Sequence, residues 1–265
     1  MSHPLARLPR SLLWLGGAFV LLLVVVATGL HRSVDRAVAA MLWQDVPCWG
    51  RTLGERASVV FAAELSLLYA LAMGFVCLRW RRPMAGGWIL FLLLAGIGVE
   101  ILLKYNFTHP SPSAFFETIR RTSCAAAGVG YPLTVVPMPS TLPSGYSIRA
   151  AYFCLLLAAM VSGRWPWLRW VAWPTLAAVA VLAAASRVTV GWHWPSDVLA
   201  GLLLGTCAAV LATAQAGNFA WLRAGAGGSP GRTAGAGRKG RGRGRGATEG
   251  SRGSGNRPPA RPPRR

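Results

Sequence analysis

Residues 85–103 read AGGWILFLLLAGIGVEILL, a run with a single charge at Glu100. About 20 apolar residues in a helix cross a bilayer core of about 30 Å, so this run is predicted to be a transmembrane helix. Five other segments have a similar length and character: Ser11–Leu30, Ser58–Leu78, Ser147–Ser162, Trp167–Ala185 and Val198–Ala214. The sequence therefore predicts an all-α protein built as a bundle of six transmembrane helices.

The composition of the chain excludes an ordinary soluble domain. Of its 265 residues, 53% are hydrophobic and 14% are charged, and its mean hydropathy is +0.42, whereas soluble proteins carry about 25% charged residues. Arg7 and Arg10 precede the first apolar segment, as basic residues precede the core of a signal peptide. That segment exceeds the ~7–15 residues of a signal core, so we expect it to remain as an anchor.

The C-terminal residues differ sharply from the apolar body. Residues 223–265 are mostly Gly, Arg, Pro, Ser and Ala and hold 12 of the 28 basic residues, with one acid, Glu249. Such a segment cannot bury enough surface to fold, so residues 1–222 are predicted to form the membrane domain and 223–265 a disordered cytoplasmic tail. Polybasic segments next to a membrane helix attract anionic lipid headgroups, by roughly 1 kcal/mol per basic residue. The Arg-Gly run at 238–245 also resembles segments that bind nucleic acid. We favour anionic lipid over nucleic acid as the partner.

The distribution of basic residues predicts the orientation. The loops and termini before the first span and after the second, fourth and sixth spans carry 19 basic residues, and the opposite side carries 9. Cytoplasmic segments are richer in Lys and Arg, so the first side is predicted to be cytoplasmic. We expect a multi-pass protein of the inner (cell) membrane, with the ends of the third and fifth spans on the periplasmic or extracytoplasmic side.

Polar residues gather at four span ends on that outer side. Ionisable groups at membrane depth are costly unless they pair with each other or with a ligand, so this gathering predicts a functional site. Glu100 lies four residues before Lys104 and either orients that side chain or only neutralises it. The gathered residues are Lys104 after the third span, Ser144, Gly145 and Tyr146 before the fourth, Arg187 after the fifth, and His193 and Asp197 around the start of the sixth.

The segment Ser186–Asp197, SRVTVGWHWPSD, carries the chemistry of this site. Pro195 suits the first turn of a helix, which places Asp197 about one turn from His193. The carboxylate can accept the proton of one imidazole nitrogen and leave the other as a nucleophile, while the planar fork of Arg187 matches phosphate oxygens. Without Arg187 at this spacing, the His and Asp would equally suit an interfacial helix cap.

These residues resemble the motifs of the type 2 phosphatidic acid phosphatase superfamily, integral membrane lipid phosphatases related to the vanadium haloperoxidases. Its motifs are Lys-x6-Arg-Pro, Pro-Ser-Gly-His and Ser-Arg-x5-His-x3-Asp, and the third is complete here. The resemblance implies that His193 attacks phosphorus to form a phosphohistidine and that Asp197 orients it. It also implies that the phosphate is held by Lys104, Arg187, Ser144 and Gly145. No metal or other cofactor is expected, because Lys104 and Arg187 supply the positive charge.

The first motif departs from the family at Ser111, which stands where the family has Arg. One phosphate-neutralising charge is therefore missing, and Ser111 is retained as a candidate phosphate contact. Sequence spacing leaves open which of four nearby basic residues replaces the Arg: His109, Arg120, Arg121 or Arg149.

The second motif departs at Tyr146, which replaces the His that protonates the leaving oxygen in the family. A phenol, with an ordinary pKa of about 10, is a poorer proton donor at neutral pH than an imidazole at about 6.5. An alkoxide leaving group needs that proton, whereas the phosphate expelled from a diphosphate is a much weaker base. With Tyr146 as the catalytic donor, the sequence favours a diphosphate substrate, such as a polyprenyl diphosphate, over a monoester.

Two other functions share these motifs. The protein would be a catalytically silent lipid-phosphate-binding membrane protein if the changes at Ser111 and Tyr146 abolish turnover. It would be a lipid phosphotransferase if a second lipid, rather than water, accepts the phosphoryl group.

The five cysteines form no pattern of metal ligands. Cys48 and Cys124 fall in the two long outer loops and would be able to pair if that side is oxidising. The other three lie inside predicted spans and are interpreted as small packing residues: Cys77, Cys154 and Cys207.

Overall fold

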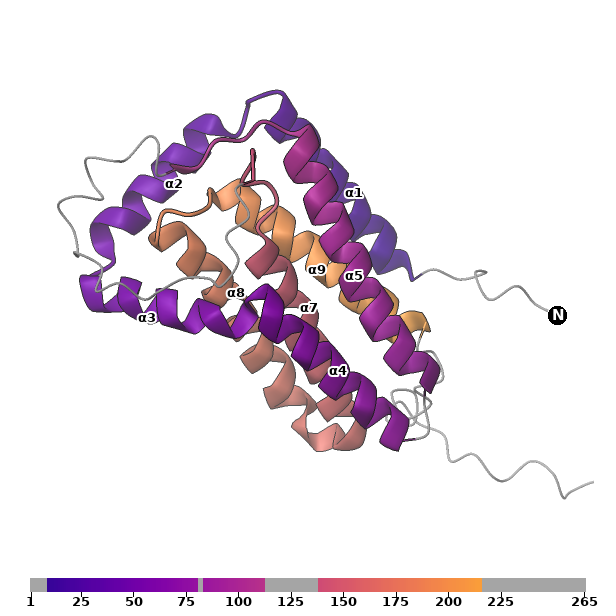
Figure 1. Cartoon of the computed structure of the whole chain (residues 1–265). Helices are drawn as coiled ribbons and strands as arrows, with labels where there is room; N and C mark the ends of the chain where they lie inside the picture. Colours follow the sequence, from indigo (N-terminus) through magenta and orange to yellow (C-terminus); the bar gives the residue numbers. More distant parts are fainter. Residues whose placement is uncertain (1–8, 81–82, 113–137, 216–265) are drawn as a thin grey trace, which may run out of the picture. The chain divides into compact units, whose positions relative to one another are not determined.

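The computed structural model describes residues 9–80, 83–112 and 138–215, and regular structure within these ranges is helical (Figure 1). The predicted tail, Arg120, Arg121 and Cys124 lie outside the described residues. The elements in chain order are α1 (Arg10–Ala27), α2 (Arg32–Asp45), α3 (Cys48–Ser58), η1 (Val59–Phe61), α4 (Ala63–Arg79), α5 (Pro83–Asn106), α7 (Gly145–Arg164), η3 (Pro166–Leu168), α8 (Arg169–Thr189) and α9 (Pro195–Gln215).

The membrane-spanning prediction is confirmed, with one span broken. Five helical segments are long and apolar enough to cross a bilayer: Arg10–Ala27, Pro83–Asn106, Gly145–Arg164, Pro166–Thr189 and Pro195–Ala214. A sixth span is formed if Thr52–Phe61 and Ala63–Arg79, which are bent by 47° at Ala62, count as one. The predicted span Ser58–Leu78 therefore contains the bend, because it begins at the last residue of α3, includes η1 and continues into α4 after Ala62.

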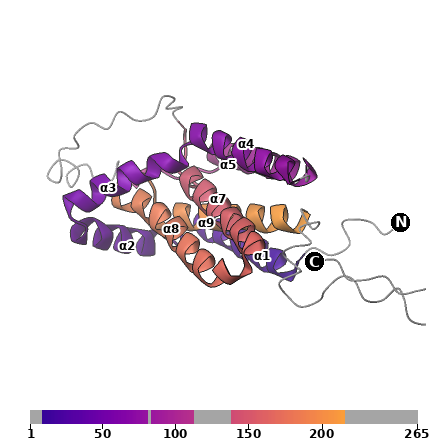
Figure 2. The same ribbon diagram turned by 90° about the horizontal axis from the view of Figure 1, so that it is seen from below.

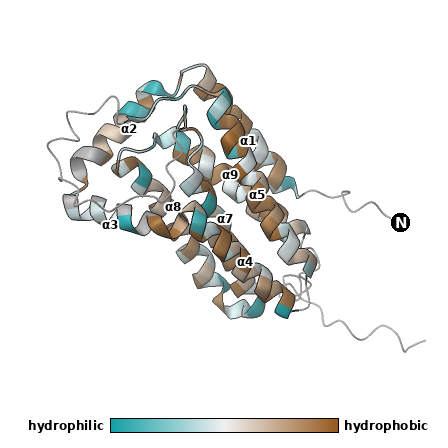
Figure 3. Ribbon diagram, viewed as in Figure 1, coloured by the Kyte–Doolittle hydropathy of each residue, from teal (hydrophilic) through white to brown (hydrophobic). Residues whose placement is uncertain are grey.

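Apolar side chains cover the outside of the bundle, which is the arrangement of a multi-pass membrane protein. Large hydrophobic residues are exposed on the described helices, among them Trp14, Leu21, Phe91 and Leu182. Hydrophobic ribbon runs along α1, α4 and α5 in Figure 3. Several charged side chains are buried instead, including Glu100 and Arg187. In water this distribution would be unfavourable, whereas in lipid the apolar surface needs no cover.

Helix α7 forms the centre of the bundle. In the apolar 18-residue stretch of α7, 72% of the residues are buried, against 6% in that of α1. Helix α7 packs against both α8 and α9. Figures 1 and 2 show α4 alongside α5, and α5 and α1 also contact α9. The close crossing of α7 and α9 depends on two glycines: a Cβ at Gly201 or Gly205 would overlap the carbonyl oxygens of Ser144 or Ile148.

The segment between the first two predicted spans is helical, not a loop. Three residues at a spacing of four, His31, Asp35 and Ala39, are buried along this segment, as expected for one face of a helix. Ala39 packs with α8 and α9 residues that include Val188 and Val198. Helix α3 also lies against α8. Gly54 allows this close approach, because a Cβ at position 54 would lie 2.9 Å from the Cβ of Ser186.

Candidate active site

Four helix ends supply the residues of the candidate site. Lys104 lies in the last turn of α5, Ser144 is the residue before α7, Arg187 lies in the last turn of α8, and Asp197 lies in the first turn of α9. The backbone N–H of Ser144 donates to the carbonyl oxygen of Asp197 at 3.0 Å. This bond ties the start of α7 to the start of α9, so both helices present their N-termini at one place.

Asp197 is fully buried and holds three groups together. Its Oδ2 accepts the backbone N–H of Trp194 at 2.9 Å, the reciprocal half of a capping box at the start of α9. Its Oδ1 accepts the Nδ1–H of His109 at 2.8 Å. The same Oδ2 lies 3.5 Å from Nδ1 of His193, which is longer than a hydrogen bond with good geometry. Asp197 therefore faces two histidines: His193, which the sequence placed beside it, and His109, which the sequence indicated only as a candidate phosphate contact.

His193 lies in the turn between α8 and α9, outside both spans. Its backbone N–H donates to the carbonyl oxygen of Arg187 at 3.2 Å, and its side chain is buried. Burial lowers the pKa of His193 below 6.5, and the positive charges of Arg187 and Lys104 lower it further, while Asp197 opposes this shift. The imidazole is therefore neutral at neutral pH and retains a nucleophilic lone pair.

A buried carboxylate joins two of the basic residues. Glu100 accepts a charge-assisted bond from Lys104 Nζ at 2.7 Å and another from Arg149 Nη1 at 3.2 Å. Arg149 also donates through Nε to the carbonyl oxygen of Phe61 at 2.8 Å. The three charges leave a net charge of +1 in this cluster. Gly145 is required beside it, because the Glu100 carboxylate occupies the space of a side chain at that position.

Tyr146 lies beside two guanidinium groups. The Cζ atom of Arg187 is 4.1 Å and that of Arg149 5.1 Å from the centroid of its ring. An aromatic face attracts cations electrostatically, so the ring positions both Arg side chains, a contribution that sequence spacing did not indicate.

The segment of the first motif lies next to the His193 turn. Trp194 Nε1 donates to the carbonyl oxygen of Pro110 at 2.7 Å. Half-buried Ser111 is the next residue in the chain and therefore lies near this contact. Among the described candidates for the missing Arg, His109 binds Asp197 and Arg149 binds Glu100. The two residues therefore lie in different clusters.

Sequence reasoning missed His31, Asp35 and Ser196. Ser196 donates to the Asp35 carboxylate through both its backbone N–H, at 3.0 Å, and its hydroxyl, at 2.6 Å. Burial raises the pKa of Asp35, although the Ser196 bonds oppose the shift. The signal available in the sequence was the spacing of four between His31 and Asp35, which becomes informative once residues 32–45 are known to be helical.

The chain is similar to known proteins in sequence and in fold. The PAP2 superfamily matches residues 85–221. An undecaprenyl-diphosphatase from Sulfolobus acidocaldarius is 37% identical over 76 residues, which are 29% of this chain and 34% of that protein. The match thus spans about a third of the curated relative. The fold is similar to the crystal structure of a transmembrane PAP2-type phosphatidylglycerolphosphate phosphatase from Bacillus subtilis, with a TM-score of 0.54, 23% identity, and 76% of this chain and 94% of that chain covered.

Proposed function

The chain belongs to the PAP2 superfamily, as its motifs predicted, and from this premise we propose that it is a membrane lipid phosphatase. The observation that carries the proposal is His193, a buried imidazole held neutral beside Asp197 and under the positive charges of Arg187 and Lys104. A neutral nucleophile next to fixed positive charge suits attack on an anionic phosphoryl group.

The proposed reaction has two displacements. A ring nitrogen of His193 attacks phosphorus in line as the bond to the leaving oxygen breaks, giving a phosphohistidine. Water then attacks phosphorus, the P–N bond breaks, and inorganic phosphate leaves. Asp197 stabilises the charged imidazole, while Arg187, Lys104, Ser144 and Gly145 bind the phosphate oxygens, and Ser111 and His109 are further candidate contacts.

The proposed substrate is a lipid diphosphate, with a polyprenyl diphosphate favoured. Tyr146 stands where the family has a general acid, and its ring is engaged with Arg187 and Arg149. A diphosphate needs little protonation of its leaving phosphate, so it tolerates this change best. The name of the Sulfolobus relative supports the same class.

The proposed location is the inner (cell) membrane with the site on its extracytoplasmic side. The basic residues support this orientation, because 19 of the 28 fall on the side opposite the site. Residues 1–222 would form the phosphatase-like membrane domain.

Phosphate release by the purified full-length protein tests the proposal. The panel comprises undecaprenyl diphosphate, phosphatidate, phosphatidylglycerol phosphate and a lyso-lipid phosphate, and we expect the fastest release from the diphosphate. H193A should abolish release while the protein stays folded in detergent, and retained release would contradict the mechanism. Lipid binding without release from any substrate would support the silent binder, and transfer to an added lipid acceptor would support the phosphotransferase.

A further inference from the structure

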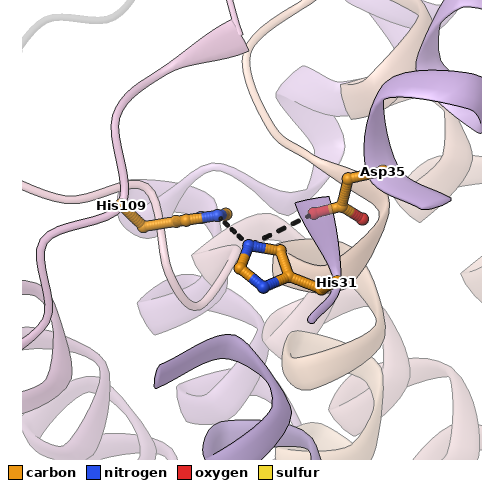
Figure 4. A group of neighbouring side chains, drawn as sticks. All are labelled: His31, Asp35 and His109. Carbon is orange, nitrogen blue, oxygen red and sulfur yellow. Dashed lines mark hydrogen bonds and ion pairs between the residues drawn. The ribbon is translucent and has the colours of Figure 1, made fainter. Parts of the chain in front are cut away.

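A second cluster of buried polar residues lies beside the candidate active site. His31 precedes α2, Asp35 lies in the first turn of α2, and His109 follows α5 (Figure 4). The three residues are 4–8% exposed, and one potential ligand atom from each lies within 4.8 Å of the others. The Nε2 atoms of the two histidines are 2.9 Å apart, and Asp35 Oδ2 is 3.9 Å from His31 Nε2.

The partners of the two histidines fix their tautomers. Nδ1 of His31 faces the carbonyl oxygen of Val25 at 3.3 Å, and Nδ1 of His109 faces Asp197 Oδ1 at 2.8 Å. Both partners accept hydrogen bonds and cannot donate one, so each Nδ1 carries the proton. With the proton on Nδ1, each ring has its lone pair at Nε2, and the two Nε2 atoms face each other at 2.9 Å. Two facing lone pairs repel each other unless a proton or a metal ion binds to them.

A metal ion satisfies the arrangement better than a shared proton. Metal-binding histidines usually donate their other N–H to a carboxylate or a backbone carbonyl, as His109 and His31 do. The third side chain, Asp35, is oriented in the same way by two hydrogen bonds from Ser196. A shared proton would account for the two imidazoles but not for a carboxylate held in place beside them.

The charge of the surroundings favours a divalent cation. Asp35 and Asp197 are both buried, at 4% and 0% exposure, and buried carboxylates are costly without compensating positive charge. Arg32 and Arg36 line the same cavity but are exposed, so water screens their effect on a buried ion. The cavity has a volume of about 530 Å³ and is lined by all three residues of the cluster, which gives an ion and its water ligands access.

We propose that His31 Nε2, His109 Nε2 and an oxygen of Asp35 bind one Zn²⁺ ion. Two nitrogens at about 2.0–2.1 Å from a tetrahedral zinc are about 3.3 Å apart, so the observed 2.9 Å requires a shift of a few tenths of an ångström. Mg²⁺ and Ca²⁺ prefer sets of oxygen ligands, and imidazole nitrogens favour the late first-row metals, with Zn²⁺ above Fe²⁺ and Mn²⁺.

The ion would join three segments that are distant in sequence. It would fix the start of α2 to the segment after α5, and through the hydrogen bonds of His109 and Asp35 it would fix both to the first turn of α9. With Nδ1 donating to Asp197 and Nε2 on the ion, His109 would not also contact the phosphate, so at that residue this inference replaces the candidate phosphate contact. Zn²⁺ binding is measured separately from phosphate release, so failure of this inference is distinguishable from failure of the proposed function.

Metal binding by the full-length protein tests the inference directly. The protein is purified without a polyhistidine tag, stripped with a chelator and titrated with Zn²⁺ against a chromophoric competitor, and Co²⁺ is added separately to record its visible spectrum. We expect one Zn²⁺ per chain, a tetrahedral Co²⁺ spectrum and no competition by Mg²⁺. Loss of a group that only orients a metal ligand weakens binding by ~10–100-fold. H31Q and D35N each alter a proposed ligand itself, so each should weaken Zn²⁺ binding by more than that.

Two further variants separate a binding site from general damage. S196A removes only the hydroxyl behind Asp35 and should weaken Zn²⁺ binding by about 10–100-fold with the helical spectrum unchanged. H193Q alters the other histidine that faces Asp197 and should retain one Zn²⁺ per chain. The inference is wrong if the stripped wild-type protein binds no Zn²⁺ at micromolar concentration, if S196A and H31Q bind it as wild type does, or if H193Q loses it as completely as H31Q.

Discussion

The pKa of His193 links the candidate nucleophile to a measurable pH dependence. Because burial and the charges of Arg187 and Lys104 lower this pKa, the imidazole stays neutral below pH 6.5. Activity should therefore decline on the acid side only at a pH below the ordinary histidine value. The measurement is kcat/KM for phosphate release against pH, and a decline centred at or above pH 6.5 attributed to His193 would contradict the assignment.

Two substitutions should move this acid limb in opposite directions. Asp197 raises the pKa of His193 and Lys104 lowers it. D197N should therefore shift the limb to lower pH, and K104Q should shift it to higher pH, while both lower the maximal rate. Equal shifts in one direction would show that the limb belongs to another group, such as the substrate phosphate.

Tyr146 distinguishes diphosphate from monoester substrates. Y146F keeps the ring beside Arg187 and Arg149 and removes only the hydroxyl, so the rate on a diphosphate should fall modestly. Y146H restores an imidazole acid and should raise activity on phosphatidate much more than on undecaprenyl diphosphate. The ratio of the two rates in each variant is independent of the amount of protein. An equal effect on both substrates would refute the leaving-group argument.

Residue spacing predicted the part of the site that lies within one segment. The segment Ser186–Asp197 includes the end of α8, the turn that contains His193 and the start of α9. In the structure Arg187, His193 and Asp197 lie close together around this turn. The contacts of Asp197 with His109 and of Asp35 with Ser196 join residues 88 and 161 positions apart. No periodic pattern in a single sequence indicates contacts between residues so far apart, so these contacts were not predicted.

At the scale of elements, hydropathy located the spans but not their ends or their contacts. The apolar runs identified the spans because lipid selects composition directly. Helix α2 was missed because its buried face is short and contains Asp35, which, like His31 just before the helix, a hydropathy pattern counts as polar. The bend at Ala62 was missed for the related reason that a composition window does not register a break in helix direction.

The crossing of α7 and α9 supports a prediction about stability. A methyl group at Gly205 would overlap the carbonyl oxygen of Ile148 and lie 2.9 Å from Ala151 Cβ, and neither atom can move without displacing the α7 backbone. G205A should therefore destabilise the folded protein by roughly 1–3 kcal/mol, measured as a lower thermal unfolding midpoint in detergent.

Gly98 provides the matched control for that substitution. It lies in the helical interior of α5 with open space where a Cβ would be, so G98A should leave stability unchanged or raise it by up to about 1 kcal/mol through helix propensity. If G205A and G98A have the same unfolding midpoint, the close approach of α7 and α9 does not limit stability.

At the scale of the whole molecule, basic residues are densest in a segment of the sequence that follows all the residues of the candidate site. Residues 223–265 hold 12 of the 28 basic residues, whereas the four helix ends that form the site all precede residue 198. We therefore expect catalysis to be independent of the tail. A protein truncated after residue 223 should release phosphate in neutral detergent at the rate of the full-length chain, and a large loss with the body still folded would show that the tail contributes to the site.

The same charge should bring the tail to an anionic membrane. Attraction of roughly 1 kcal/mol per basic residue would hold the tail against vesicles containing phosphatidylglycerol but not against phosphatidylcholine alone. Trypsin should therefore cleave the tail more slowly in the anionic vesicles. Salt at about 1 M, where the Debye length is about 3 Å, should remove that protection, because the attraction is electrostatic. Equal cleavage rates in both vesicles at low salt would contradict the assignment of anionic lipid as the partner of the tail. Protection that persists at high salt would indicate contacts other than charge.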